Sequence, residues 1–394
     1  MKCATSVKIK DKDNYLQVKI MNRRTFILGG LGTLGVLAGG GVLFTQRPEF
    51  GRLPRGERLA RLEASPHYVN GKFQNLVPMQ VMNERNGENR LVAMAKFLFG
   101  DKSHLSPKQV MLSKKTDLQT LNPAEDVVVW LGHSSFFMQL GDYRILIDPV
   151  FSPYASPLFF INKAFPGSNV YTAEEMPEID VLAISHDHWD HLDYPTIMAL
   201  KPKVKQIVCP LGVGEYFESW GFAREKLHEE DWDTEIKLAD DLSVHVLTSQ
   251  HFSGRFLTPN PTLWCGFAFI TPQRKVYYTG DGGYGEHFKA IGQKFGGFDM
   301  MLGENGQYNM AWHAIHMLPE ETAQAAEEVG AKLLLPAHGG KFALSRHPWQ
   351  EPYRELTKAS RDKNYKLVTP EIGQLAYIDG QKNEQFGPWW ENME

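Results

Sequence analysis

Four residues of the kinds that bind metals stand within one short stretch of the sequence. His186, His188, Asp190 and His191 form an H-x-H-x-D-H string directly after the apolar run 181–184. A strand that ends in a tight turn can deliver the first two imidazoles to one cation, while the carboxylate and the third imidazole, at the start of the next helix, reach a second. Imidazole and carboxylate ligands together suit zinc, and also manganese, iron or nickel. The string therefore predicts half of a two-metal site rather than a histidine-rich surface turn.

Three later segments offer further ligands, which two metal ions would need. His251 follows the alternating stretch 243–247, Asp281 lies in a Gly-Asp-Gly turn, and His338 follows an apolar run that begins at Leu333. Each of the three lies at the carboxyl end of a predicted strand, where loops can converge on one cleft. The glycines beside Asp281 allow the backbone to approach closely.

The order of these residues resembles the signature of the metallo-β-lactamase superfamily, which is H-x-H-x-D-H, then His, then Asp in a Gly-Asp turn, then His. The resemblance implies an α/β fold, the αβ/βα four-layer sandwich, in which two mixed sheets face each other and helices cover the outside. It also implies two divalent metal ions, zinc in the first place with manganese or iron as alternatives. One ion would be held by His186, His188 and His251, the other by Asp190, His191 and His338, with Asp281 bridging them.

The chemistry that this resemblance implies is hydrolysis by a hydroxide held between the metals. Two cations lower the pKa of a bound water and stabilise the oxyanion that forms when it attacks an ester, amide or phosphodiester. Asp281 is the catalytic candidate among the ligands, and no nucleophilic serine or cysteine is required.

A narrower resemblance is to the branch that contains N-acyl-phosphatidylethanolamine-hydrolysing phospholipase D and its bacterial relatives. It rests on the stretches 61–73, 130–135, 146–152, 177–193 and 316–323, and it covers residues 51 to 359. The branch implies a phosphodiesterase that acts on a phospholipid. Two alternatives are a lactonase of the ascorbate-phosphate lactonase type, which attacks carbon instead of phosphorus, and a metal-bearing envelope protein that binds without turnover. The complete ligand set argues against the second alternative.

Three residues outside the ligand set also match the branch. His316 matches a histidine that lies near the metals, and we expect it to position the substrate phosphate or to protonate the leaving alkoxide. His313 is close enough in sequence to compete for that assignment. We expect His133 and Asp148 to support metal ligands by hydrogen bonds rather than to bind metal themselves. A structural role is the alternative for His133, and a turn cap is the alternative for Asp148.

Composition agrees with a large soluble catalytic domain. The chain has 394 residues, of which 42% are hydrophobic, and its 35 glycines and 23 prolines suit a loop-rich α/β protein. A formal net charge of -4 provides no general basic field for phosphate backbones and so argues against a nucleic-acid substrate. The expected partner is a phospholipid or another small ester. The sequence does not specify an oligomeric state.

Several local patterns predict individual elements. Strands are expected over 127–131, 136–140 and 143–147, with a hairpin turn between the last two, and a helix over 319–329. The apolar cluster 91–99 is expected to be a core helix, with a lipid-facing wall as the alternative. Cys209 and Cys265 lie in strand-like runs, where buried thiols are commoner than a disulfide.

The N-terminus predicts export or membrane anchoring. Residues 26–44 form a 19-residue stretch without a charge, and Arg23-Arg24 before it resembles a twin-arginine signal with Met21 as an alternative start. The stretch is long enough to cross a bilayer, although its glycines weaken a helix. The alternative is a buried apolar helix in a cytoplasmic protein. We therefore expect residues 1–50 to be a signal or anchor in the bacterial envelope, 51–126 a leader that packs on the catalytic domain, and 127–394 the catalytic domain.

Overall fold

The computed structural model describes residues 7–11, 14–18, 43–78, 101–255, 258–380, 382 and 386–393. The chain divides into two units, residues 1–50 and 51–394. In the first unit, β1 (Val7–Asp11) and β2 (Asn14–Val18) pair as an antiparallel hairpin, and η1 (Pro48–Phe50) is a short 3-10 helix. Residues 26–42 of the expected apolar span 26–44, the Arg23-Arg24 pair before it and the apolar cluster 91–99 lie outside the described residues. None of the helices in the described ranges is both long enough and apolar enough to cross a membrane.

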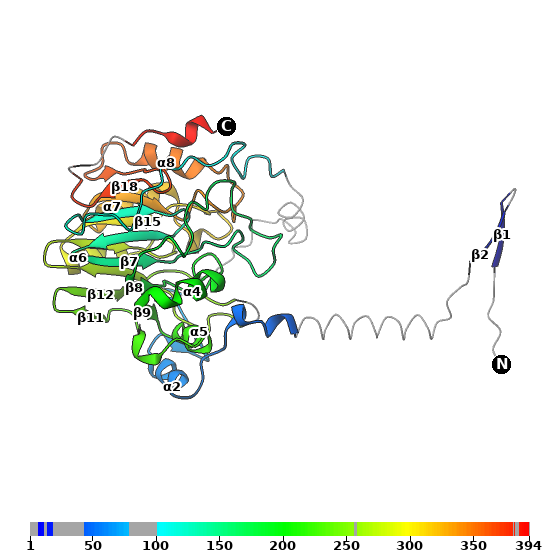
Figure 1. The fold of residues 1–394 in the computed structure, drawn as a ribbon, viewed down its shortest axis with the longest axis horizontal. Helices are drawn as coiled ribbons and strands as arrows, with labels where there is room; N and C mark the ends of the chain where they lie inside the picture. Colours follow the sequence, from blue (N-terminus) through cyan, green and yellow to red (C-terminus); the bar gives the residue numbers. More distant parts are fainter. Residues whose placement is uncertain are drawn as a thin grey trace. The chain divides into compact units, whose positions relative to one another are not determined.

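The second unit is built on two seven-stranded mixed sheets that face each other (Figure 1). The first has the order β10-β9-β8-β7-β6-β5-β18, and its strands are β5 (Val127–Trp130), β6 (Phe136–Leu140), β7 (Tyr143–Ile147), β8 (Ile179–Ala183), β9 (Val204–Pro210), β10 (Leu227–Glu230) and β18 (Leu375–Tyr377). The second has the order β11-β12-β13-β14-β15-β16-β17, formed by β11 (Glu235–Ala239), β12 (Leu242–Leu247), β13 (Gly266–Ile270), β14 (Lys275–Tyr278), β15 (Phe298–Glu304), β16 (Ala331–Ala337) and β17 (Lys366–Leu367). A separate two-stranded sheet joins β3 (Tyr68–Val69) to β4 (Lys72–Phe73).

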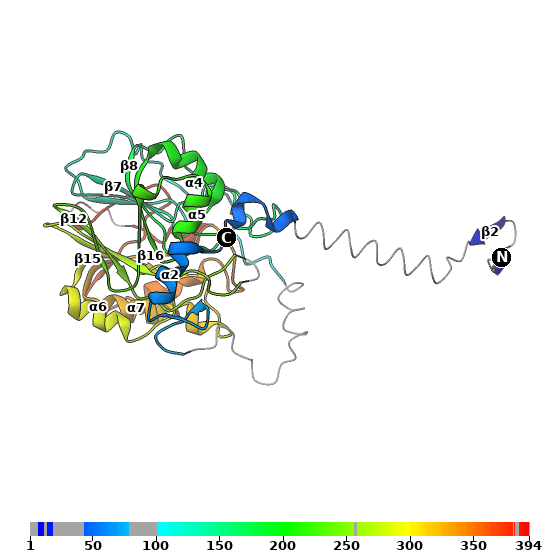
Figure 2. The ribbon, with the colours of Figure 1, turned by 90° about the horizontal axis from the view of Figure 1, so that it is seen from below.

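Helices cover the outer faces of both sheets. Figure 2 shows the layers edge-on, with α4 and α5 beyond β7 and β8, and α6 and α7 beyond the second sheet. The α-helices of this unit are α2 (Gly56–Ala64), α4 (Tyr194–Leu200), α5 (Gly214–Ser219), α6 (His287–Phe295), α7 (Pro319–Glu328) and α8 (Glu351–Ala359). The short 3-10 helices are η2 (Lys201–Lys203), η3 (Arg224–Lys226), η4 (His313–Ile315) and η5 (Trp389–Asn392). The expected four-layer αβ/βα sandwich is confirmed.

Successive residues of each strand pack into different layers, as the pleat requires. In β8, Val181 and Ala183 lie in the core between the sheets, whereas Leu182 packs with the apolar residues of α4 and α5. In β14, Tyr278 lies between the sheets and Tyr277 packs outward, in the cluster that includes α6 and α7. Both faces of these strands are therefore buried, which explains why they read as nearly continuous apolar runs.

Most of the local predictions hold. Strand β6 and strand β7 have the expected bounds, and Gly141 and Asp142 between them both have positive φ, as a tight two-residue hairpin turn needs. The helix that begins at Pro319 is also confirmed, with the proline in its first turn. Cys209 and Cys265 are both buried free thiols, so the disulfide alternative is wrong.

One local prediction is wrong, because Asp190 and His191 do not lie at the start of a helix. They lie in a turn in which the backbone N–H groups of His191 and Leu192 both donate to the carbonyl of His188. Helix α4 begins later and carries a proline in its first turn. Extending the helix back to His191 would place the ring of that proline against the carbonyl four residues earlier, which a helix does not tolerate.

Helix α2 is fixed to the rest of the unit by a buried guanidinium. The Arg58 side chain is 8% exposed and lies 2.8 Å from the carboxylates of Glu215 on α5 and Glu229 on β10, with Glu218 as a third partner. Glu229 also accepts a hydrogen bond from the backbone N–H of Gly212. The charges are buried together, so removing the cation would leave carboxylates buried without a partner.

We expect Arg58→Met to lower the free energy of unfolding by about 3–5 kcal/mol, the usual effect of breaking a buried ion pair from one side. The matched control is Arg224→Met, because Arg224 pairs with Glu57 at a site where both side chains are mostly exposed. That change should cost less than about 1 kcal/mol. Urea unfolding of both variants measures the difference, and equal losses would contradict the role given to Arg58.

Candidate metal centre

The expected ligands come from the carboxyl ends of strands in both sheets. His186 and His188 follow β8, His251 follows β12, Asp281 follows β14 and His338 follows β16. Four of them are buried, and His188 is partly buried. In an α/β sandwich these strand ends meet at one edge, which is why residues far apart in the sequence converge there.

Three imidazoles form the first group. His188 Nδ1 lies 2.9 Å from His186 Nε2 and 3.2 Å from His251 Nε2. Nitrogens bound to one zinc ion at 2.0–2.1 Å in a tetrahedral arrangement lie about 3.3 Å apart. The observed spacing therefore suits a single cation between the three ring nitrogens.

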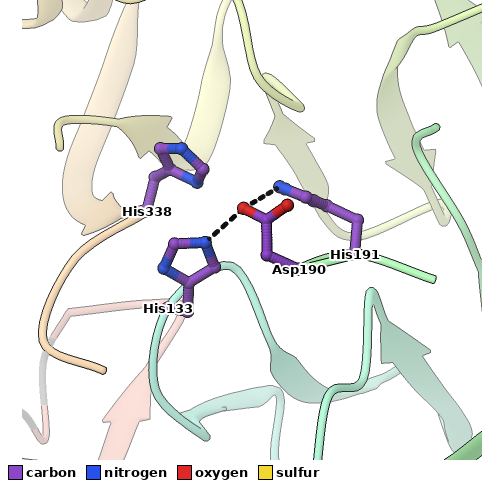
Figure 3. A group of neighbouring side chains, drawn as sticks. All are labelled: His133, Asp190, His191 and His338. Carbon is purple, nitrogen blue, oxygen red and sulfur yellow. Dashed lines mark hydrogen bonds and ion pairs between the residues drawn. The ribbon is translucent and has the colours of Figure 1, made fainter. Parts of the chain in front are cut away.

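The second group contains the other expected ligands and one additional histidine. Ligand atoms of Asp190, His191, His338 and His133 all lie within 4.8 Å of one another, and Figure 3 shows the four side chains pointing toward a common centre. His133 Nε2 donates to Asp190 Oδ2 over 2.8 Å. This contact agrees with the expected supporting role of His133, because it fixes the direction of a carboxylate ligand.

Asp281 lies between the two groups. Its Oδ2 is 4.0 Å from His186 Nε2 and 3.9 Å from His251 Nε2 on one side, and 3.0 Å from His191 Nε2 on the other. Its Oδ1 is 3.1 Å from His338 Nδ1. A carboxylate that faces both groups is placed as a bridging ligand requires.

The donor atoms of the site fit cations on two independent grounds. First, His338 Nε2 is buried without a hydrogen-bond partner, and His191 Nε2 and Asp281 Oδ1 lie at ion-pair distance from their neighbours but form no hydrogen bond with them. Such buried atoms are costly unless something binds them. Second, burial lowers the pKa of His186, His251 and His338 well below its usual value, so these rings are neutral, which is the form that binds metal.

Asp148 is the centre of the hydrogen-bond network behind the ligands. Its Oδ2 accepts from His191 Nδ1 over 2.8 Å, from the Tyr278 hydroxyl over 2.7 Å and from Ser185 Oγ over 2.5 Å. Its Oδ1 accepts from the Ser185 backbone N–H. A carboxylate that holds Nδ1 leaves Nε2 of His191 to face the metal, so Asp148 has the geometry of the expected supporting residue.

The backbone at the site is held in an uncommon conformation. His133, Asp148 and His338 have φ of 55°, 40° and 63°, in the left-handed region that costs energy for residues other than glycine. Backbone hydrogen bonds hold the first and last together, because His133 N–H donates to the Gly339 carbonyl and His338 N–H to the His133 carbonyl. Strain of this kind persists only where the surrounding structure fixes it, and here it directs the side chains into the site.

His316 lies at the site and His313 does not, which separates two histidines that the sequence left ambiguous. The His316 ring is 5.2 Å from the His251 ring and stacks on the His338 ring at 5.1 Å. His313 instead pairs with Glu321 over 2.9 Å. The branch-derived assignment of His316 therefore has a geometric basis.

The partner of His316 is Glu304, a residue that the sequence analysis missed. Glu304 Oε1 lies 3.2 Å from His316 Nδ1, and Oε2 accepts from the backbone N–H of Met317. Burial raises the pKa of Glu304 to about 7, and the contact with His316 offsets part of that effect. Burial alone would lower the pKa of His316, but the hydrogen bond that His316 donates to Glu304, together with the negative charges of Glu304, Asp281 and Asp190, raises that pKa. The available signal was its position at the end of the apolar run of β15.

A second missed group supports the turn of the H-x-H-x-D-H string from outside. The carboxylate of Asp187 accepts from the Tyr216 hydroxyl and from the Gly254 backbone N–H, both over 2.8 Å. Arg255 Nε donates to the Asp187 carbonyl over 2.6 Å, and its guanidinium lies 4.4 Å from the centre of the Trp189 ring. The sequence contains no motif that predicts this group, because its residues hold a backbone turn in place by hydrogen bonds and are not expected to bind a cation.

Comparison with known proteins identifies the domain. A family model described as beta-lactamase superfamily domain matches residues 143–339, which include all seven expected ligands. An uncharacterized protein of Mycobacterium tuberculosis is 35% identical over 332 residues, which cover 83% of this chain and 88% of the relative. Among solved structures, a possible metal-dependent hydrolase from Veillonella parvula has a TM-score of 0.52 at 14% identity and covers 64% of this chain and 100% of its own. This last likeness concerns the fold alone.

Two further relatives have descriptive names. N-acyl-phosphatidylethanolamine-hydrolyzing phospholipase D 1 of Caenorhabditis elegans is 28% identical over 62% of this chain and 74% of its own length. Outer membrane protein RomA of Klebsiella pneumoniae is 56% identical over 106 residues, which cover 27% of this chain and 80% of RomA.

Asp148→Asn should weaken metal binding by about 10–100-fold, because the uncharged amide keeps only one acceptor oxygen and cannot accept all the hydrogen bonds, including that from His191, that the two carboxylate oxygens accept. Competition with a fluorescent zinc chelator measures the affinity. The matched control is Asp299→Asn, since Asp299 is another buried aspartate but lies at the start of β15, away from the end that carries Glu304, and pairs with Lys332. Unchanged zinc affinity in Asp148→Asn would remove Asp148 from the support of the centre.

Proposed function

This chain belongs to the metallo-β-lactamase superfamily, and from that premise we propose that it is a dinuclear metal-dependent hydrolase that cleaves phosphodiesters of N-acyl-phosphatidylethanolamine-like phospholipids. The observation that carries the hydrolase part is the pair of ligand groups with Asp281 between them. The same arrangement argues against a protein that binds without turnover, since a binding role would not need a complete set.

The ligands divide between two cations in this proposal. His186, His188 and His251 would hold one, Asp190, His191 and His338 would hold the other, and Asp281, which lies between the two groups, would serve both. Zinc suits the mixed imidazole and carboxylate donors, and manganese or iron are the alternatives. Bound cations of this kind supply a water of lowered pKa and positive charge near the developing oxyanion.

His316 supplies the proton that the leaving alcohol needs. Glu304 holds Nδ1, which leaves Nε2 for transfer, and a ring nitrogen of His316 lies within 4.8 Å of ligand atoms of His251 and Asp281. A buried carboxylate that orients an imidazole in this way resembles the partner arrangement of other acid–base histidines. Glu304 acts through His316 and is a positioning residue.

The phospholipid part of the proposal rests on similarity. The relative from Caenorhabditis elegans carries the name of a phospholipase D that hydrolyses N-acyl-phosphatidylethanolamine, and the branch motifs of the sequence agree with it. We propose the bacterial envelope as the location, supported by the twin-arginine-like start and by the partial match to an outer membrane protein.

Zinc-loaded full-length protein should release N-acylethanolamine and phosphatidic acid from N-acyl-phosphatidylethanolamine, as detected by mass spectrometry. Asp281→Asn should abolish the release, because the bridging carboxylate is lost, whereas Asp299→Asn should retain it. A six-carbon lactone phosphate is the parallel substrate. Opening of the lactone alone would replace the phosphodiesterase by a lactonase, and no product from either in a preparation with two metals per chain would contradict the proposed substrates.

His316→Gln should lower kcat on the phospholipid by about 10²–10⁴-fold, the usual effect of losing a general acid. The loss should be much smaller on a p-nitrophenyl phosphodiester, whose leaving group needs no proton. His313→Gln is the matched control and should leave both rates unchanged, because His313 pairs with Glu321 away from the cluster. Equal losses on both substrates, with loss of zinc, would make His316 a metal ligand instead.

A further inference from the structure

The loop that follows Asp148 ends in an exposed aromatic tip. Phe159 and Phe160 are 74% and 66% exposed, and Ile161 beside them is 39% exposed. Among the residues whose burial the structure describes, Phe159 and Phe160 are the only exposed aromatic side chains. The two rings contact each other edge to face at 5.3 Å and leave their other faces uncovered. Apolar surface gathered at one projecting point marks an interaction site rather than ordinary exposure.

This tip is carried by an ordered hairpin. Tyr154 and Lys163 form an antiparallel bridge, Ala155 N–H donates to the Asn162 carbonyl over 3.0 Å, and Ala164 N–H donates to the Pro153 carbonyl over 2.9 Å. The tip itself is closed by a turn between residues 158 and 161. Much of its backbone hydrogen bonding is therefore satisfied internally, which is the condition for entering an apolar medium.

The charge around the tip favours an anionic partner. Residues 149–171 contain no acidic residue and one lysine, the exposed Lys163. The neighbouring segment 102–115 also lacks acidic residues and contains four lysines. The two segments are side by side, since Met111 N–H donates to the Pro166 carbonyl over 2.8 Å. In that second segment Val110 and Leu112 are exposed as well. Lys115 is paired with Glu175, and the exposed Lys102, Lys108 and Lys163 add positive charge to the apolar surface of these two segments.

The base of the hairpin is part of the wall of the metal centre. Ala155 packs in a buried cluster with Val150 and Phe342. The Phe342 ring in turn lies 5.2 Å from the ring of His133, which holds Asp190. A partner bound at the tip would therefore be held in a fixed position relative to the metal centre.

We propose that the hairpin 153–164 inserts Phe159, Phe160 and Ile161 into the surface of an anionic lipid bilayer, with the nearby lysines against the headgroups. The occupant is a bilayer rather than a second copy, because the patch combines aromatic insertion with clustered positive charge. The inference deepens the proposed function, since it places the metal centre at the surface from which a phospholipid would enter. It does not use the N-terminal segment.

A fluorophore at the tip tests this without reliance on turnover. Full-length Cys3→Ser protein with Phe160→Cys is labelled with an environment-sensitive nitrobenzoxadiazole group, since Cys209 and Cys265 are buried. The control carries the same label at Lys289→Cys, an exposed position on α6. Vesicles of phosphatidylcholine with phosphatidylglycerol should shift the emission at 160 to the blue with a several-fold rise in intensity, and should leave the emission at 289 unchanged.

The contribution of positive charge is tested by changing Lys163 in the same labelled protein. Lys163→Glu should require several-fold more anionic lipid for the half-maximal response, because one attraction becomes a repulsion. No shift at position 160 on anionic vesicles, in protein with normal zinc content, would overturn the proposal. A shift that appears without vesicles and grows with protein concentration would also overturn it in favour of a second copy. Because the experiment measures fluorescence and not catalysis, the emission shift still tests membrane insertion if the phospholipase assay fails.

Discussion

The fold depends on the burial of many polar groups at one edge of its two sheets. Six of the seven expected ligands are buried and His188 is partly buried, and several of the nitrogen and oxygen atoms in this group have no hydrogen-bond partner in the protein. Burying such groups without compensation costs free energy that a domain of ordinary stability cannot absorb at so many positions. Bound cations would offset this cost, because neutral imidazoles and carboxylates are good metal ligands. The stability of the fold and the presence of metal at this edge are therefore expected to be coupled.

The remaining structure keeps the ligands in place. Asp148 ties β7 to the string after β8 and to Tyr278 in the facing sheet, so one carboxylate joins both sheets behind the ligands. Asp187 ties the turn of the string to Tyr216 of α5, whose neighbour Glu215 is bound by Arg58 of α2. Helix α2 is thus connected to the turn of the H-x-H-x-D-H string through one short helix, α5, although α2 contributes no residue to the two ligand groups.

The residues that converge at this edge stand out in the sequence because most of them follow an apolar strand, and metal-binding residue types at such positions are distinctive; that they bind metal stays a prediction. The hairpin turn at Gly141 and Asp142 could also be predicted, because these residue types favour a two-residue turn between strands. The placement of Asp190 and His191 was not, since the effect of Pro195 on the preceding turn depends on where the helix begins. Glu304, Asp187 and Arg255 were missed for a different reason. Their partners are distant in sequence, so only the packed structure makes their contacts visible.

Anomalous diffraction from a crystal of the zinc-loaded protein tests the central claim most directly. The account predicts two zinc peaks per chain, one among His186, His188 and His251 and the other among Asp190, His191 and His338, with Asp281 between them. A single peak, or zinc bound elsewhere while these side chains keep their present contacts, would contradict the dinuclear centre on which the hydrolase proposal is built.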